Sequence, residues 1–414
     1  MPEKTSRFYY GYVIVAISAI IGAIAFGNMR SFGVFLDPLI QAFGWSRGAT
    51  SMAVTIQALV TGFMAILAGK LSDRFGPRIV LTVSGLLIGA GYILCSFINE
   101  RWQFYLIQGS MVGVGLAGIM VPLTSLVVRW FTQRMGLMNG LVNSGIGLGT
   151  MVVPPLATWI IEEYDWRKAF LVLGCGCLVL ITGFSQFLKR PSLAQIESAG
   201  DNFKLKTSDS AHDFSFREAI KTRTYWMLSI MFFTDVFAVN SMMTHIVIHT
   251  EDLLASQAVD PRTAATAATM VLSAAAGVSI FGRIAAGAVS DRVGVRSTIG
   301  IGLGMLSLSF IWLLFAKQLW MLYLFAVVFG ISGWCVGSVL SPLVAEYFGL
   351  KSHGVILGAV NFTGILGGSI GPLLTGIIFD KMKSYNVAFI LCASMTTLGI
   401  ILLQFLKKPG GRYE

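Results

Sequence analysis

Charged side chains are scarce in this chain: Asp, Glu, Lys and Arg make up 12% of its 414 residues, whereas 55% are hydrophobic. Soluble domains carry about 25% charged residues, and the mean hydropathy of +0.75 points the same way. This shortage of charge excludes a soluble globular protein of this length. It leaves a protein that crosses a lipid bilayer many times.

Several kinds of site are also missing. Each of the five cysteines lies in an apolar stretch, which excludes a disulfide framework and a cysteine zinc site. His245 and His249 lie four residues apart, but no third ligand accompanies them at a metal-binding spacing. The sequence has no Walker A loop and no nucleophile–base set within its apolar runs. We therefore predict no metal, no organic cofactor, no direct use of ATP and no enzymatic activity.

A basic patch is absent too, although the formal net charge is +10. The Lys and Arg residues are not clustered with interleaved aromatic residues, as nucleic-acid-binding surfaces are. The sequence therefore predicts no nucleic-acid partner.

Long uncharged runs, in contrast, are abundant. A hydrocarbon core of about 30 Å needs roughly 20 apolar residues as a helix. Nine uncharged windows meet this length, and three more spans contain ionisable residues, namely Arg30 with Asp37, Asp235, and Arg283. The sequence thus predicts an all-α integral membrane protein with twelve spans, at about 9–42, 48–69, 79–98, 102–128, 135–161, 169–188, 224–252, 263–289, 297–316, 319–345, 354–379 and 387–406.

The distribution of Lys and Arg predicts the topology. Of these 30 residues, 20 fall on one side of the predicted membrane, 8 on the other side, and 2 within it. Because basic residues accumulate on the cytoplasmic side of membrane proteins, we expect both termini to be cytoplasmic. The positive charge then reflects topology.

The only long polar stretch, 189–222, follows the sixth span and predicts a cytoplasmic linker between two six-helix halves, 1–188 and 223–414. The halves match each other at a constant offset of 218 residues. Residues 69–78 correspond to 287–296, and Gly136, Asn143 and Pro154 correspond to Gly354, Asn361 and Pro372. Parallel repeats of this kind are a transporter architecture, with the substrate near the bilayer midplane between the repeats.

The duplicated loop Gly-x-x-x-Asp-Arg-x-Gly-x-Arg resembles the signature loop of the major facilitator superfamily. The resemblance implies twelve helices in two pseudo-symmetric halves. Asp73 and Asp291 end a helix, where they can bind Arg side chains and backbone amides. We interpret the loops as a gating motif that closes the cytoplasmic side, formed by Asp73, Arg74, Arg78, Asp291, Arg292 and Arg296.

Arg283 is the leading candidate for substrate binding. A charged side chain near the bilayer centre costs roughly 2.5–3.5 kcal/mol on insertion scales, so it faces a cavity or a partner. A guanidinium matches a carboxylate bidentately, although an Arg that binds backbone carbonyls and holds helices together is the alternative. Arg30, with Asn28 two residues before it, is a second candidate, and its alternative role is structural snorkelling.

Two ionisable residues of the seventh span are candidates for proton coupling. Asp235 could carry a proton or neutralise a buried Arg, for which Arg30 is a candidate partner. His245 could titrate near a cavity mouth, or it could form a hydrogen bond between helices.

Five further residues are candidate cavity residues. Each of the asparagines could bind substrate or bridge helices, and the aromatic residue could equally belong to the core. They are Asn139, Asn143, Ser338, Asn361 and Phe362.

Beyond the superfamily, nearly the whole chain resembles bacterial members of the monocarboxylate transporter family. The supporting segments are Arg30-Ser-Phe-Gly-Val-Phe-Leu36, Phe43-Gly-Trp-Ser-Arg-Gly48, Arg129-Trp-Phe131, Met135-Gly-Leu-Met-Asn-Gly140, Trp166-Arg-Lys-Ala-Phe170, His245-Ile-Val and Gly282-Arg-Ile-Ala-Ala-Gly287. The resemblance implies symport of a small monocarboxylate, such as L-lactate or pyruvate, with a proton as the coupling ion. It also implies a location in the bacterial cytoplasmic membrane, and we expect a monomer to be functional.

The resemblance also carries residue roles. Arg30 occupies the place of a first-span lysine that animal members use for proton and substrate handling. Arg283 matches the arginine of an Asp–Arg pair in the eighth span, but Ser279 stands at the acid position. Carboxylate exchangers of the oxalate–formate type are similar too and remain the alternative. Their dianions need two cations, however, and 354–379 is uncharged, which favours a monoanion.

Overall fold

The computed structural model describes residues 9–131, 133–191 and 213–409, and within them every regular element is a helix. Twelve helical stretches are long and apolar enough to cross a membrane. Each overlaps one predicted span; for example, the predicted span 135–161 is the helix Met135–Glu163. The prediction of an all-α integral membrane protein with twelve spans is thus confirmed.

The first six spans consist of ten helical pieces, because two of the spans are broken. They are α1 (Gly11–Arg30), α2 (Phe32–Phe43), α3 (Arg47–Phe75), α4 (Pro77–Cys95), α5 (Arg101–Phe104), the π-helix η1 (Tyr105–Met111), α6 (Val112–Ala117), α7 (Met120–Trp130), α8 (Met135–Glu163) and α9 (Trp166–Ser185).

The second six spans follow a short helix that precedes the seventh span, and one of these spans is broken. The pieces are α11 (Phe216–Ala219), α12 (Arg223–Ala255), α13 (Pro261–Val293), α14 (Val295–Leu313), α15 (Leu319–Ser332), α16 (Cys335–Phe348), α17 (His353–Met382) and α18 (Asn386–Gln404).

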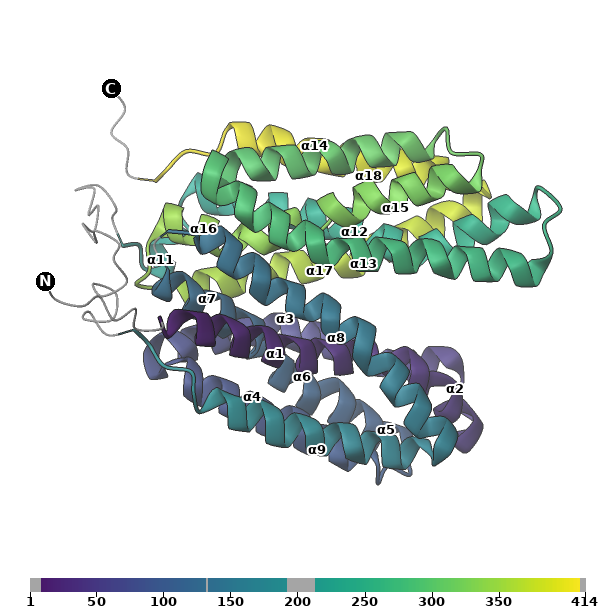
Figure 1. Cartoon of the computed structure of the whole chain (residues 1–414), viewed down its shortest axis with the longest axis horizontal. Coiled ribbons are helices and arrows are strands. Elements are labelled where there is room, and N and C mark those ends of the chain that lie inside the picture. Colours follow the sequence, from purple (N-terminus) through teal and green to yellow (C-terminus); the bar gives the residue numbers. More distant parts are fainter. Residues whose placement is uncertain (1–8, 132, 192–212, 410–414) are drawn as a thin grey trace, which may run out of the picture.

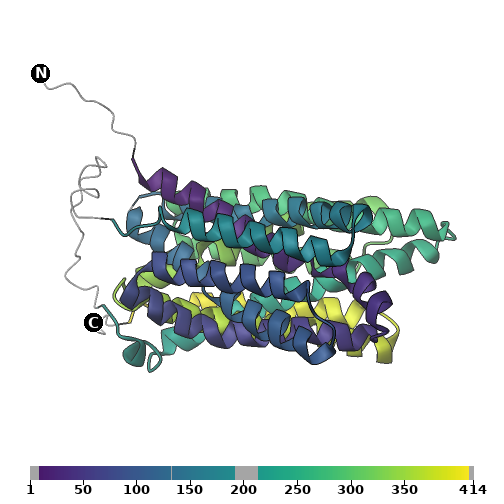
Figure 2. The same cartoon turned by 90° about the horizontal axis from the view of Figure 1, so that it is seen from below.

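The helices form two bundles that run along one axis (Figures 1 and 2). In the first bundle α1 packs on α8 and α4 on α9, and in the second α12 packs on α17 and α14 on α18. These pairs correspond to each other under the 218-residue offset, so the duplicated sequence produces duplicated packing. Residues 192–212 of the predicted linker lie outside the described part of the chain, and the limits at 188 and 223 stay predictions.

The two bundles meet along two helix crossings, α3 with α17 and α8 with α13. Glycines allow the backbones to touch: a Cβ on Gly69 would lie 2.1 Å from the Gly354 carbonyl oxygen, and one on Gly287 would lie 2.2 Å from that of Gly136. Small residues allow such close approach of membrane helices. The duplicated glycines of the sequence therefore build the interface between the halves.

Two breaks interrupt corresponding spans beside the centre of the molecule. The fourth span is interrupted between α6 and α7 at Gly118, and the tenth between α15 and α16 at Gly333. Discontinuous helices in membrane transporters place irregular backbone where it lines a cavity. Both breaks border a central cavity, which Ala117 and Met120 line beside the first break and Gly333 and Trp334 beside the second.

Candidate functional site

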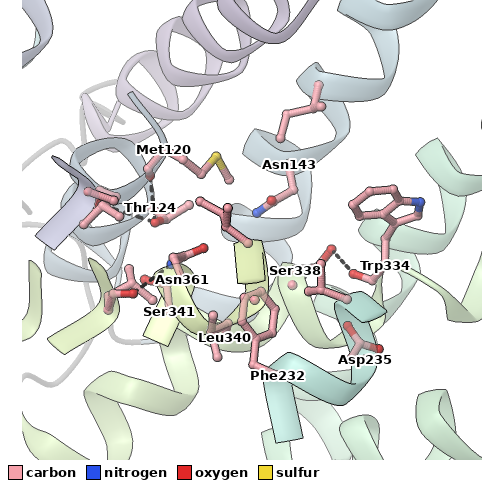
Figure 3. Close-up of a pocket in the computed structure, with 18 of the residues that line it drawn as sticks. Met120, Thr124, Asn143, Phe232, Asp235, Trp334, Ser338, Leu340, Ser341 and Asn361 are labelled. Carbon is pink, nitrogen blue, oxygen red and sulfur yellow. Dashed lines mark hydrogen bonds between the residues drawn. The ribbon is translucent and has the colours of Figure 1, made fainter. Parts of the chain in front are cut away.

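A cavity of about 250 Å³ lies between the two bundles. Its wall comes from α1, α3, α6, α7 and α8 of the first bundle and from α12, α13, α16 and α17 of the second. Figure 3 shows side chains from both bundles converging on this space. The residues that line it include Phe26, Thr61, Leu116, Met120, Val121, Thr124, Asn143, Ile146, Phe232, Asp235, Val236, Asn240, Arg283, Trp334, Gly337, Ser338, Leu340, Ser341, Leu357, Asn361 and Ile365.

Arg283 is the cation of this cavity. It lies on α13, is 5% exposed, and its guanidinium carbon stands 4.6 Å from the centre of the Trp334 ring. Its Nη1 donates a hydrogen bond of 3.1 Å to the carbonyl oxygen of Asn143 on α8. No carboxylate of the described residues lies within ion-pair distance of it. A guanidinium has five N–H donors, so Arg283 both joins the bundles and keeps donors for an anion.

Trp334 owes its position to the break in the tenth span. It precedes the first residue of α16 and has a non-helical backbone, with φ −115° and ψ 10°. The Arg283 guanidinium lies over the face of this ring, and a cation over an aromatic face is attracted by the ring quadrupole.

Asp235 is the acid of the same cavity. It lies on α12, is 3% exposed, and its Oδ1 has no hydrogen-bond partner. Within the described residues it forms no ion pair with either Arg30 or Arg283. The suggested neutralisation of Arg30 by Asp235 is therefore not seen in this conformation.

Arg30 ends α1 and does not line the cavity. Its side chain is exposed in this conformation.

The other candidates divide into two groups. Asn143, Ser338 and Asn361 line the cavity, whereas Asn28, Asn139 and Phe362 do not. The side-chain amides of Asn28 and Asn139 donate to the carbonyl oxygens of Ile24 and Met135, one turn earlier in their own helices. Phe362 packs on Phe63 of the other bundle, with ring centres 4.6 Å apart.

His245 lies outside the cavity lining, and both of its ring nitrogens have partners. Nε2 is 3.0 Å from the carbonyl oxygen of Pro372, and Nδ1 is 3.3 Å from the hydroxyl of Tyr385. Burial, with Asp252 and Asp380 nearby, raises the pKa of Tyr385 to about 12, so its hydroxyl keeps its proton and can donate to Nδ1. A carbonyl only accepts, so Nε2 carries the ring proton. This geometry matches the interhelical alternative for His245.

The gating-motif loops join the bundles at one end of the molecule, here called the motif end. Asp73 accepts hydrogen bonds from the backbone N–H of Val355 and from Arg129, both at 3.1 Å. Asp291 accepts from the backbone N–H groups of Gly136 and Leu137, both at 2.8 Å. Each Asp thus binds the N-terminus of a helix in the other bundle, where the helix dipole favours a negative charge.

The arginines of the motif act within their own bundles. Arg78 donates to the side-chain oxygen of Gln186 at the end of α9, and Arg296 donates to the carbonyl oxygen of Gln404 at the end of α18. Gln186 and Gln404 differ by the same 218 positions as Arg78 and Arg296. Arg74 lies over the ring of Phe75, and Arg292 borders a separate surface depression at the motif end.

A buried histidine adds to the closure of the motif end. The Nδ1 of His353 on α17 is 2.9 Å from the hydroxyl of Ser125 on α7, and its Nε2 is 2.9 Å from the carbonyl oxygen of Ser341. The hydrogen bonds that join the two bundles within the described residues all lie between Arg283 and this end. The structure is therefore closed at the motif end.

Sequence reasoning missed a large part of the apolar wall, including Met120, Val121, Phe232, Val236 and Leu340. Hydrophobic residues fill the lipid-facing and the cavity-facing sides of these helices alike, so no pattern distinguishes the two. The break at Gly118 is the one signal that could have pointed to the neighbouring Met120.

Comparison with known proteins agrees with this arrangement. The sequence profile of the Major Facilitator Superfamily matches residues 18–283 and 253–413, which together span nearly the whole chain. The chain belongs to the Major Facilitator Superfamily.

Similar superfamily members include monocarboxylate transporter 13 of Rattus norvegicus, with 27% identity over 94% of this chain and 87% of the relative. The uncharacterised transporter YhjX of Escherichia coli is 28% identical over 83% of each chain. Among solved structures, the E. coli fucose:proton symporter FucP has a TM-score of 0.72 at 13% identity, covering 97% of this chain and 100% of that chain. These relatives are membrane transporters, so this superfamily member is a transporter and not an enzyme.

Proposed function

We propose that the protein is a secondary transporter that carries a small monocarboxylate, of the L-lactate or pyruvate type, together with a proton. The conformational change would be alternating access, in which the two bundles rock around the central cavity. The observation that carries the proposal is Arg283, a buried guanidinium beside the cavity that no carboxylate of the described residues neutralises. A substrate carboxylate supplies the missing charge.

The character of the remaining wall supports an acid over a sugar, although FucP carries fucose. A sugar needs many hydrogen bonds from its site. In this cavity, Thr124 and Ser338 each donate their single O–H to a carbonyl oxygen of their own helix, at 3.0 and 2.8 Å, and Asn361 uses one of its two N–H groups in the same way, at 2.9 Å. A ligand with one charged end and few hydroxyl groups fits these surroundings better.

Asp235 supports the coupling to a proton. An unpaired carboxylate in an apolar site costs free energy that protonation removes. Asp235 lines the same cavity as Arg283, so access from alternating sides of the membrane would let it take up a proton on one side and release it on the other. Arg30 carries no such role in this proposal, since a guanidinium does not deprotonate in proteins.

The distribution of Lys and Arg supports an orientation in which the motif end and both termini face the cytoplasm, on the inner side of a bacterial cytoplasmic membrane. The conformation described above would then be closed toward the cytoplasm. A monomer contains the complete cavity, so one chain suffices for this mechanism.

The test is uptake of labelled L-lactate into proteoliposomes, with and without an inward proton gradient. We expect the wild type to accumulate lactate and Arg283→Ala to lose binding about 10- to 100-fold, the value of one charge-assisted hydrogen bond of roughly 1.5–3 kcal/mol. Arg283→Lys keeps the charge without the planar fork and should fall between them. Arg217→Ala, at an exposed site on α11, is the control.

Wild-type affinity in Arg283→Ala would contradict the assignment of the carboxylate site. Uptake that requires a second carboxylate preloaded inside the vesicles, and ignores the proton gradient, would instead support the exchanger.

A further inference from the structure

The central cavity is larger than a three-carbon acid requires. Its volume of about 250 Å³ corresponds to about eight water molecules at roughly 30 Å³ each. Pyruvate has a carboxylate, one carbonyl and one methyl group, so it leaves much of this space to water. Water against an apolar wall is unfavourable, and a ligand that displaces it gains affinity.

Much of the wall is apolar, and this apolar part comes from both bundles. Met120 and Val121 of α7 belong to it, together with Phe232 and Val236 of α12 and Leu340 of α16. Figure 3 shows the side chains of Met120, Phe232 and Leu340 around the same space. These groups offer apolar contact area and no hydrogen bonds.

Several polar side chains of the wall use a donor within the protein. Asn143 donates to the carbonyl oxygen of Asn139 at 2.8 Å, and Asn240 donates to that of Val236 at 3.1 Å. Thr61 donates to the carbonyl oxygen of Gly113 at 2.9 Å. Such bonds use one donor of each side chain. Each of these asparagines keeps a second N–H, and the hydroxyl of Ser341 has no partner, so the polar part of the wall is confined to a few groups.

Gly337 keeps part of this space open. It lies inside α16 and lines the cavity, and a Cβ at this position would meet no atom within 4 Å. The other two glycines of the cavity wall are tightly packed: a Cβ on Gly364 would lie 2.4 Å from the Phe232 ring, and one on Gly333 would lie 2.9 Å from the carbonyl oxygen of Phe329. Glycine inside a helix is less stable than alanine by roughly 0.5–1 kcal/mol, so packing gives no reason for Gly337, whereas room for a ligand does.

We infer that the preferred substrate is a monocarboxylate with a bulky apolar tail, branched or aromatic, and that Gly337 sets the size of tail that fits. The inference rests on the proposed function, because Arg283 holds the carboxylate. The tail lies against the wall of α7, α12 and α16, and it displaces water that a three-carbon acid leaves behind. Pyruvate and L-lactate are then weaker substrates of the same site.

The test compares three 2-oxo acids that differ only in their tails: pyruvate, 4-methyl-2-oxopentanoate and phenylpyruvate. Binding to the purified full-length protein is measured by titration calorimetry, and competition is measured against labelled pyruvate uptake into proteoliposomes. We expect each larger acid to bind at least about tenfold more tightly than pyruvate, the effect of added methylene groups in an apolar pocket.

Variants at Gly337 test whether this residue limits the size of the tail that the cavity accepts. Gly337→Ala should weaken binding of the larger acids moderately, and Gly337→Leu should weaken it strongly, at least about tenfold more than it weakens pyruvate binding. Gly176→Leu is the matched control, because Gly176 lies within α9, away from the cavity, and a Cβ there also meets no atom within 4 Å. The midpoint of thermal unfolding in detergent shows whether each Gly337 variant is folded.

The outcomes separate the two proposals. Pyruvate binding as tightly as the larger acids, or equal losses for all three acids in Gly337→Leu, would overturn this inference and leave monocarboxylate transport standing. If none of the acids binds the wild type, the proposed function fails and this inference fails with it.

Discussion

At the scale of single residues, the two buried ionisable side chains of the cavity have different surroundings. Arg283 has an aromatic face and one backbone carbonyl as partners, whereas the Oδ1 of Asp235 has none. Burying either charge without compensation is costly. A guanidinium cannot release its proton, so it requires an anion; a carboxylate can remove its own charge by protonation. The two residues are therefore suited to different ligands, an anion and a proton.

This difference predicts the behaviour of Asp235→Asn, which keeps the shape of the side chain but cannot titrate. We expect substrate exchange between two equilibrated sides to continue, while accumulation driven by a proton gradient falls at least tenfold. Labelled lactate uptake, measured as exchange and as gradient-driven accumulation, separates the two. Asp252→Asn, at an exposed position on the same helix, should change neither. Full gradient-driven accumulation by Asp235→Asn would exclude Asp235 as the proton carrier.

At the scale of helices, the crossing of α8 and α13 places the site. A Cβ on Gly140 would lie 2.5 Å from the backbone carbonyl oxygen of Arg283, and one on Gly147 would lie 3.1 Å from the Arg283 guanidinium. Because Gly140 and Gly147 have no side chain, the α13 backbone can approach α8 closely, and the Arg283 side chain can extend past it. The crossing of α17 with α3 corresponds to that of α8 with α13 under the 218-residue offset. The duplication therefore produces two equivalent crossings.

Gly140→Val should therefore act on both packing and binding. Overpacking of a tight contact costs about 1–3 kcal/mol, so we expect a lower midpoint of thermal unfolding in detergent together with weaker substrate binding. Gly176→Val, where a Cβ meets no atom within 4 Å, should leave both unchanged. If Gly140→Val unfolds at the wild-type temperature and binds substrate with wild-type affinity, close contact between α8 and α13 is not required for stability or for binding, and the prediction is wrong.

At the scale of the whole molecule, closure depends on a reciprocal pair of contacts. Asp73 of the first bundle holds the N-terminus of α17, and Asp291 of the second holds the N-terminus of α8. Arg129 and His353 add hydrogen bonds across the same end. Because these contacts can exist only while the motif end is closed, they bias the equilibrium between the two states of access.

Asp73→Asn and Asp291→Asn should each shift that equilibrium toward opening of the motif end, by roughly 1.5–3 kcal/mol for a charge-assisted hydrogen bond. The double variant should shift it by about the sum, since the two carboxylates share no hydrogen-bond partner. The measurement is the reactivity of a cysteine at the cavity residue Ser341 toward an impermeant maleimide applied only from the motif side of sealed vesicles, in protein whose five native cysteines are replaced. Asp260→Asn keeps a helix cap outside the motif loops and is the control. Unchanged reactivity in the double variant would contradict the gating role.

The sequence alone determined the twelve spans and the duplication, and it singled out Arg283 as a buried charge, because a bilayer demands long uncharged helices and makes a buried charge exceptional. From the sequence, six residues were equal candidates for the cavity. Only the tertiary structure showed that three of them line it, namely Asn143, Ser338 and Asn361, and that the other three do not, namely Asn28, Asn139 and Phe362. The reason is physical: lipid, helix interfaces and an apolar cavity all accept the same side chains. Which side of a helix faces the cavity depends on how the two bundles cross, and the crossings are set by contacts between residues far apart in the chain.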